Sequence, residues 1–467
     1  MHLRRALIVV ATAGLSCVAA VPGLASSAGV KGSPQPELKP FTISATSDSS
    51  GGTVAVASSG ALVVAYDIKT GNGETRVCVL DRGARSCSST STLTPLTGDS
   101  TSGEPQVFAL PDKRVVVLEG ACCDADGNGD VLYTSTDGGK SFDGGVRVGS
   151  LSVASAALAG DDIVFGTGGH DGAQVESIST TTLTPPGSTT TAIAAVSYAM
   201  ALGTYAGGAL VASEDGSDDT SVSYATAGSD FNAASSYKPV GTFSDEGLIA
   251  LSGGALLTQQ TTGKGELELR IFNGTSFGAE HVVPGDEDGG GPVDYTVDQD
   301  PSGAVHVFAE LARDGYNLLE SSTTTGASWT SQRYVGNAID NDYLNVGLDS
   351  NGAGLVLGLN NPATGYPVLG SQSVSFSLSS SSVKTGRTVI GKGVGSPVAA
   401  KRAVSLQQER SGLWYTVATT HEKSNGSYAF TIKGTKAGTS QYRAVVNDFA
   451  GYLQYGYSSP RTLHVVR

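Results

Sequence analysis

Short apolar runs separated by small polar turns recur along most of the chain. Each unit has an apolar strand, a turn rich in Gly, Ser, Asp or Asn, and a second apolar strand, a pattern typical of β-hairpins. Seven such units begin at Gly52, Glu104, Ser152, Ser197, Glu246, Pro292 and Tyr343. Consecutive units start 45 to 52 residues apart. A regular spacing of this size predicts a repeat architecture in which each repeat is one four-stranded sheet.

A second pattern marks the later half of several units. A glycine is followed three residues later by an aromatic residue in "GKSF" from Gly139, "GSDF" from Gly228, "GTSF" from Gly274 and "GASW" from Gly326. Another strand follows each of them, which completes four strands per unit. We therefore expect an all-β protein with an approximately seven-bladed β-propeller over residues 38–371, a six-bladed ring being the alternative. The last unit lacks a fourth strand, and "LKPFTIS" from Leu38 could supply it and close the ring.

The segment "VLYTSTDGGKSF" contains the best-formed copy of this turn. Its residues Ser135, Asp137, Gly139 and Phe142 resemble the Asp box, or bacterial neuraminidase repeat, of sialidase-like β-propellers. In that family the box lies on the turn between the third and fourth strands, away from the axial pocket, so the resemblance implies a structural role. An Asp that accepts turn amides, a permissive glycine and an aromatic between blades fit such a role.

The composition changes after Gln372, where a Ser-rich joint leads into a more basic segment of short alternating strands. Residues 372–467 are predicted to form an Ig-like β-sandwich. The segment resembles the Ig-like or fibronectin-like modules attached to bacterial secreted proteins, which implies a spacer, surface-attachment or weak glycan-binding role.

The N-terminus predicts export. Basic residues precede an apolar run, and small residues follow it near Ala25, as in a secretory signal peptide over residues 1–28. No later stretch reaches the ~20 apolar residues of a membrane helix. The formal net charge of −14 argues against nucleic acid and anionic membranes as partners. We expect a secreted monomer, free in the medium or associated with the cell surface.

The cysteines suit an oxidising compartment. Cys78 and Cys87 flank a turn, so a cross-strand disulfide is expected between them. Cys122 and Cys123 are adjacent, and either a vicinal disulfide or two buried thiols would fit.

Candidate chemistry gathers in loops that share one face of a propeller, those before each inner strand and those after each second strand. These loops are rich in Asp and Glu, for example around Glu104, Asp245 and Asp294. Glu119 and Glu310 end second strands on the same face and are the candidate carboxylate pair of a glycoside hydrolase. Plain structural glutamates at strand ends are the alternative for both.

One loop has the oxygen ligands of a hard cation. Asp124, Asp126, Asn128 and Asp130 alternate around Gly129, as calcium ligands do, so Ca²⁺ is a candidate ligand although no cofactor is required. Ser135 stands where an EF-hand has its bidentate Glu, and an Asp/Asn/Gly turn is the other interpretation.

Sialic acid hydrolysis is disfavoured. A sialidase holds the substrate carboxylate with an arginine triad. The expected Arg-Ile-Pro motif is absent, and only Arg313 falls in a pocket loop. The sequence thus predicts recognition of an extracellular glycan or protein through the acid-rich face, with glycoside hydrolysis, sialidase-like in a special case, as the alternative.

Overall fold

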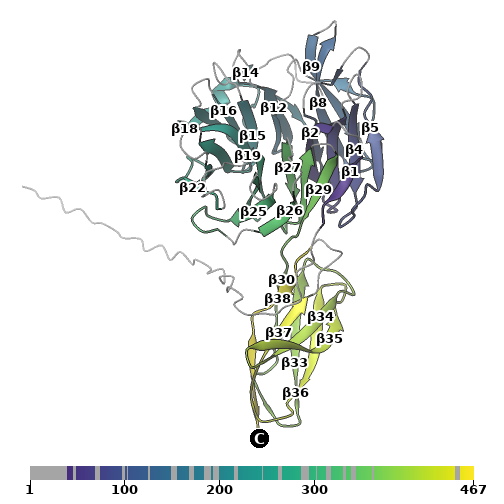
Figure 1. Ribbon diagram of the computed structural model, residues 1–467, viewed down its shortest axis with the longest axis vertical. Coiled ribbons are helices and arrows are strands. Elements are labelled where there is room, and N and C mark those ends of the chain that lie inside the picture. The colour runs from purple at the N-terminus through teal and green to yellow at the C-terminus, as the bar shows by residue number, and fades with distance from the viewer. Residues whose placement is uncertain are drawn as a thin grey trace, which may run out of the picture.

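The structure is a computed structural model, and its strands form a ring of sheets with an elongated second body attached to it (Figure 1). It describes residues 39–467 apart from 46–48, 69–73, 97–99, 102–103, 125–126, 149–154, 168–172, 184–190, 193–198, 215–218, 245, 261–265, 285–293, 301, 312–316, 330–332, 338–342, 360–361 and 447–452. The expected signal peptide lies outside this part. Apart from the short 3-10 turns η1 (Pro111–Lys113) and η2 (Ala234–Ser236), every regular element within it is a strand.

The ring contains seven antiparallel sheets in the described residues, which we number as blades in chain order. Blade 1 is β2 (Ser49–Val56), β3 (Leu62–Ile68), β4 (Glu74–Leu80) and β5 (Ser89–Thr92). Blade 2 is β6 (Ser100–Thr101), β7 (Gln106–Ala109), β8 (Val115–Asp124), β9 (Gly127–Ser135) and β10 (Val146–Arg147). Blade 3 is β11 (Ser155–Ala159), β12 (Asp162–Thr167), β13 (Gln174–Ser179) and β14 (Thr191–Ala192).

The later blades repeat this order. Blade 4 is β15 (Ala199–Tyr205), β16 (Gly208–Glu214), β17 (Thr220–Ala225) and β18 (Lys238–Phe243). Blade 5 is β19 (Glu246–Ser252), β20 (Ala255–Gln260), β21 (Leu267–Ile271) and β22 (His281–Val282). Blade 6 is β23 (Asp294–Gln299), β24 (Val305–Leu311), β25 (Asn317–Thr323) and β26 (Arg333–Asn337). Blade 7 is β27 (Tyr343–Leu348), β28 (Gly354–Leu359), β29 (Ala363–Val368) and, from the start of the chain, β1 (Phe41–Ser44).

The innermost strands close a circle. They contact one another in the order β2, β7, β11, β15, β19, β23 and β27, and β27 contacts β2 again. The fold is therefore an all-β propeller, and its sheets match in number and order the seven repeats of the sequence. The segment that follows Leu38 does supply the outer strand of the last blade, because β1 pairs with β29.

Apolar clusters fill the spaces between neighbouring blades. Within the described residues there is one such cluster for each adjacent pair of blades. Between blades 1 and 7, for example, Tyr66 and Ile68 pack against Leu355 and Leu357. The strands are thus buried on both faces, which explains their nearly continuous apolar runs.

The segment of blade 2 that resembles an Asp box forms the turn after the third strand, and we call it the Asp-box turn. Asp137 Oδ1 accepts hydrogen bonds from the backbone amides of Lys140 (2.9 Å) and Ser141 (3.0 Å). The Ser135 hydroxyl accepts from the Gly139 amide at 2.9 Å and donates to Asp137 Oδ1 at 2.8 Å. Hydrogen bonds, first from the Ser141 hydroxyl, lower the pKa of Asp137 to about 2. Phe142 packs into the cluster between blades 1 and 2.

The predicted disulfide between Cys78 and Cys87 is present, with a Cα–Cα distance of 5.4 Å. Its place differs in detail from the expected cross-strand position. Thr90, not Cys87, lies opposite Cys78 in the ladder of β4 and β5. Cys87 belongs to the preceding loop, so the disulfide ties this loop to β4. Cys122 and Cys123 lie in β8, but their side chains are outside the described part of the chain.

The second body is a β-sandwich with its own core. One sheet contains β30 (Ser373–Val374), β31 (Ser377–Leu378), β33 (Thr388–Ser396) and β36 (Ser427–Lys433). The other contains β32 (Ser382–Lys384), β34 (Ala403–Arg410), β35 (Leu413–His421), β37 (Gly438–Val446), β38 (Gly456–Tyr457) and β39 (Arg461–Val466). Phe376, Phe430, Leu406 and Tyr442 are among the side chains packed between the sheets.

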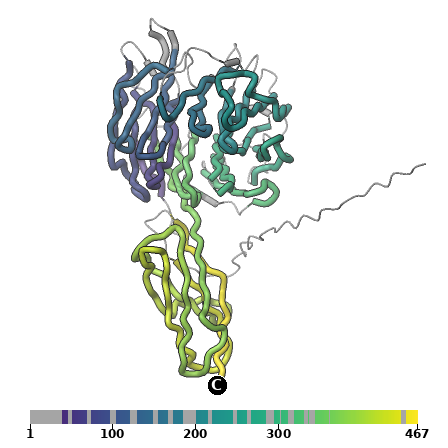
Figure 2. Tube along the Cα trace, turned by 180° about the vertical axis from the view of Figure 1, so that it is seen from behind, coloured from purple at the N-terminus to yellow at the C-terminus, as the bar shows by residue number. Residues whose placement is uncertain are grey.

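A short segment after β29 joins the two bodies (Figure 2). The Ser371 amide donates to the Asn351 carbonyl in the first turn of blade 7, and Gly370 forms a β-bridge with Leu453 of the sandwich. Because all third strands of the ring run in the same sense, the end of β29 lies on the face that carries the Asp-box turn. The sandwich is therefore attached opposite the acid-rich face.

Candidate functional site

Three second strands bring buried carboxyl groups to the acid-rich face of the ring. Asp67 lies near the end of β3 in blade 1, Glu119 in β8 of blade 2 and Glu310 near the end of β24 in blade 6. Their exposed fractions are 8%, 2% and 0%. Carboxyl groups are seldom this buried unless they have partners, so their surroundings are informative.

One threonine links two of these groups across the boundary between blades. Thr75 Oγ1 lies 2.6 Å from Asp67 Oδ1 and 2.6 Å from Glu119 Oε1. A hydroxyl has a single hydrogen to donate, so one of the two carboxyls must carry a proton that it donates to Thr75. Burial, followed by the charges of Glu119 and Glu104, raises the pKa of Asp67 to about 8, although its hydrogen bond with Thr75 opposes the rise. Asp67 is therefore the protonated member at neutral pH.

Two further carboxyls come from the loops that lead into inner strands. Burial raises the pKa of Glu104, just before β7, to about 7. Its side chain lies on Gly51, where φ is +68° and a Cβ would come within 2.8 Å of Glu104 Cγ. A glycine is required there for both reasons. Asp294 begins β23 directly opposite Glu310, and burial raises its pKa to about 7.

These five groups influence one another's protonation. The charge of Glu104 contributes to the raised pKa of both Asp67 and Asp294, and that of Glu310 contributes at Asp294. Groups from blades 1, 2 and 6 therefore lie within electrostatic range at one end of the ring. We call Asp67, Glu104, Glu119, Asp294 and Glu310 the carboxyl cluster. At neutral pH it holds acids and carboxylates together, so it offers hydrogen-bond donors and acceptors.

The structure thus brings Glu119 and Glu310 into one cluster, and it adds a member that the sequence reasoning missed. Asp67 ends the apolar run "LVVAYD" just as Glu310 ends "VHVFAE". Comparing this position across the repeats would have found Asp67. Thr75 could not have been found, because its role depends on a contact between two blades.

Most of the candidate calcium loop lies outside the described residues. Asp126 is outside the described residues, as are the side chains of Asp124 and Asn128. The backbone of Asp124 pairs with Gly127 across the hairpin of β8 and β9, and Asp130 is fully buried in β9. No group of three or more His, Cys, Asp or Glu side chains in the described part is arranged to hold a metal ion. Calcium binding stays a prediction, and the pocket-loop residues Asp245 and Arg313 are likewise outside the described ranges.

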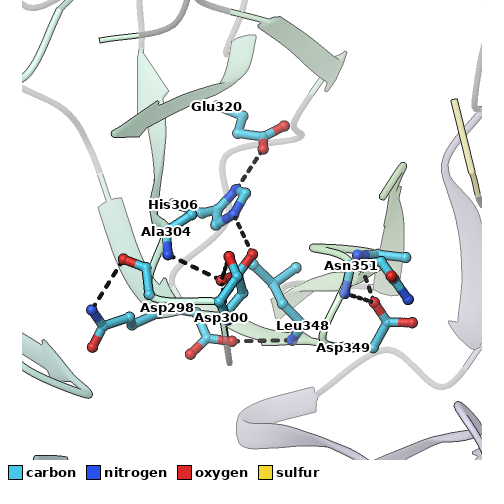
Figure 3. Close-up of polar contacts among 12 residues, drawn as sticks. Asp298, Asp300, Ala304, His306, Glu320, Leu348, Asp349 and Asn351 are labelled. Atoms are coloured by element: carbon cyan, nitrogen blue, oxygen red, sulfur yellow. Dashed lines mark hydrogen bonds and ion pairs between the residues drawn. The ribbon is translucent and has the colours of Figure 1, made fainter. Parts of the chain in front are cut away.

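A separate polar network lies at the other end of blade 6, because His306 is near the start of β24 and Glu310 near its end. Figure 3 shows His306 together with Asp300 and Glu320. His306 Nδ1 is 2.9 Å from Glu320 Oε1, and His306 Nε2 is 3.5 Å from Asp300 Oδ2. Burial alone would lower the pKa of His306, but the hydrogen bonds and charges of these two carboxylates raise it to about 9. Asp298 accepts a hydrogen bond from the Leu348 amide of blade 7 and one from the Ser252 hydroxyl of blade 5. Asp298 thus links blade 6 to both of its neighbours, whereas His306 and its two carboxylate partners all belong to blade 6.

The described part of the chain contains no helix that is long and apolar enough to cross a membrane.

Comparisons with known proteins assign no family. No family model matches the sequence, and no curated protein matches it. Among solved structures, an uncharacterized protein from Listeria monocytogenes is 13% identical with a TM-score of 0.42, covering 69% of this chain and 92% of that one. A six-bladed fungal lectin with fucose recognition, from Aleuria aurantia, is 12% identical with a TM-score of 0.35 over 85% and 99%. An ulvan lyase, a polysaccharide lyase, is 11% identical with a TM-score of 0.34 over 68% and 78%. At these values the similarities identify no activity for this chain.

Proposed function

We propose that this protein is exported and binds an extracellular glycan at the carboxyl cluster. The observation that carries the proposal is the convergence of five carboxyl groups from three blades at one end of the ring, with acids and carboxylates side by side. Sugar hydroxyls donate and accept hydrogen bonds at once, so a mixed set of this kind is complementary to them. The disulfide between Cys78 and Cys87 supports an oxidising compartment.

The cluster favours a glycan without a carboxylate of its own at this face. The charges that raise the pKa values of Asp67 and Asp294 are those of other carboxylates. An anionic sugar placed there would add a like charge to a partly desolvated site, which is unfavourable. A neutral or amino sugar is therefore the better ligand, and sialic acid a poor one.

The test is a glycan array with the mature chain, followed by calorimetry on the best ligand. Glu119→Gln keeps the shape of the side chain but replaces the carboxyl group by an amide, and we expect it to weaken binding at least tenfold, about 1.4 kcal/mol. Asp112→Asn is the matched control, because Asp112 is exposed at the other end of blade 2. Equal affinity of the two variants, or no ligand on the array, would contradict the proposal.

Glycoside hydrolysis is a second candidate, favoured by one observation. A glycosidase needs a protonated carboxyl beside an ionised one, and Asp67 and Glu119 are such a pair around Thr75. Fluorogenic glycosides would detect turnover. Release of fluorophore that disappears in both Asp67→Asn and Glu119→Gln would make the protein an enzyme, whereas binding without turnover would restrict it to recognition.

A further inference from the structure

The charges of the chain are divided unequally between its two bodies. Residues 1–371 contain 17 Lys and Arg against 40 Asp and Glu, a formal charge of −23, whereas residues 372–467 contain 12 against 3, a formal charge of +9. A domain of this size with so few acidic residues attracts anionic ligands. The sandwich thus differs from the propeller in the ligands that its surface favours.

One arginine of the sandwich is held between two aromatic rings. The Arg443 guanidinium carbon in β37 lies 4.4 Å from the centre of the Trp414 ring and 4.6 Å from the centre of the Tyr457 ring. Gln407 Oε1 accepts a hydrogen bond from Arg443 Nε at 2.8 Å. The rings come from β35 and β38, so four strands contribute to the arrangement. We call Trp414, Arg443 and Tyr457 the Arg443 platform.

The platform lies on the outer face of its sheet. The adjacent residues Tyr442 and Ala444 point into the core between the sheets, and side chains alternate along a strand. Arg443 therefore points away from the core. Tyr457 is 39% exposed although its ring is large and apolar. Neither ring belongs to the apolar cluster between the sheets, so packing of the core does not explain them.

The guanidinium also retains an unused donor. Arg443 is only 8% exposed, and its Nη2 is buried without a hydrogen-bond partner among the described residues. An unpaired buried donor costs free energy, and sites that bind polar ligands keep such donors for the ligand. The donor lies beside two rings, which indicates a ligand with an anionic group next to an apolar ring face.

We propose that the Arg443 platform binds an anionic polysaccharide whose sugars carry carboxylates. The exposed part of the Tyr457 ring would pack on the C–H face of a pyranose, and the guanidinium would donate to the uronate carboxylate. Double-stranded DNA carries one charge per about 1.7 Å, and the acidic propeller would oppose so dense a polyanion more strongly. This site is distinct from the carboxyl cluster and does not depend on the function proposed for it.

The test is affinity electrophoresis of the full mature chain in native gels that contain polygalacturonate, with dextran as the neutral polymer. Polygalacturonate should retard the protein and dextran should not. Arg443→Gln and Tyr457→Ala should each weaken the interaction at least tenfold. Lys433→Gln removes the same charge from an exposed position on the other sheet and should change it less than twofold. Arg443→Lys should also lose affinity, because lysine keeps the charge but lacks the planar fork.

Three outcomes would overturn the proposal. They are the absence of retardation by polygalacturonate, equal loss in Lys433→Gln and Arg443→Gln, and binding of double-stranded DNA as tight as that of polygalacturonate. Because Arg443→Gln could unfold the sandwich, its circular dichroism and melting curve are compared with those of Tyr457→Ala, whose ring is partly exposed. Glu119→Gln should leave the retardation unchanged, which separates this site from the carboxyl cluster.

Discussion

His306 gives the clearest single-residue dependence of stability on pH. Its pKa is raised from 6.5 to about 9 in the folded protein because Asp300 and Glu320 hold the imidazolium. The folded state therefore binds a proton more tightly than the unfolded one. The resulting stabilisation is fully present below pH 6.5 and is lost as the pH rises through 9. We expect His306→Gln to lower the free energy of unfolding by about 2 kcal/mol at pH 6, the worth of charged hydrogen bonds.

Urea unfolding at pH 6 and pH 9.5 checks this. The wild type should lose stability between the two values, and the loss should be smaller in His306→Gln. His464→Gln, at an exposed position of β39, is the control and should behave like the wild type. An unchanged pH dependence in His306→Gln would show that the imidazolium does not stabilise the ring.

Deprotonation of Asp67 should also lower the stability of the protein as the pH rises. At Asp67 the cause is the formation of a buried charge, whereas at His306 it is the loss of a charge that its partners hold. The pKa of Asp67 rises from 3.8 to about 8 on folding, first through burial, so the folded state retains a proton that the unfolded state loses. Stability must then fall as the pH rises from 4 to 8. Asp67→Asn removes the buried charge, and its melting temperature should exceed that of the wild type at pH 9 by more than at pH 5. A constant difference across this range would contradict a protonated Asp67.

The sequence identifies such residues only where a repeat position or a motif marks them. Glu119 and Glu310 could be named because each ends an apolar second strand. The raised pKa values of Glu104 and Asp294 depend on burial at the ring's mouth, and the hydrogen bonds of Asp298 depend on contacts with two neighbouring blades. Contacts of that kind leave no local pattern, so they could not be predicted from one sequence.

At the scale of the element, the Asp-box turn depends on two glycines for different reasons. Gly139 has φ +89°, and a Cβ there would lie 3.1 Å from Val79 in the neighbouring blade. Gly138 has φ +84° with open space around it, and Gly144 has open space without a positive φ. We expect Gly139→Ala to lower the free energy of unfolding by about 2 kcal/mol and Gly138→Ala to lower it by about 1 kcal/mol, from backbone strain alone. Gly144→Ala should change it by almost nothing. Melting temperatures of the three variants test this order, and equal values would contradict it.

The same turn shows which features of an element the sequence predicts well. In blade 6, Thr324 stands at the position that corresponds to Asp137 of blade 2. The turn forms nevertheless, because Thr323 Oγ1 accepts the Gly326 amide at 2.9 Å and donates to the Ser328 carbonyl at 2.8 Å. The glycine and the aromatic are therefore better markers of the turn than the Asp. The disulfide shows which detail of an element the sequence does not predict. The sequence predicts the bond between Cys78 and Cys87, but it does not predict that Cys87 lies in the preceding loop and that Thr90 faces Cys78 in the ladder.

At the scale of the whole molecule, ring closure by β1 determines whether blade 7 has a free edge. Phe41 and Thr42 pair with Gly365 and Thr364 of β29, and Phe41 also packs in the cluster between blades 1 and 7. Gly365 leaves room for the aromatic ring, because a Cβ there would lie 2.9 Å from Phe41 Cζ. An unpaired β29 would expose backbone donors and acceptors that invite pairing with another chain.

A chain that begins at Ala45 should therefore unfold at a lower temperature and self-associate, whereas a chain that begins at Pro40, which keeps β1, should match the mature protein. We expect the truncation to Ala45 to lower the free energy of unfolding by about 3 kcal/mol, because the burial of Phe41 and Ile43 and the hydrogen bonds between β1 and β29 are lost. Size-exclusion chromatography and thermal unfolding measure both effects. If the two truncated chains were equally stable and monomeric, the pairing of β1 with β29 would contribute nothing to ring closure. The blades would then be held by the apolar clusters between them alone.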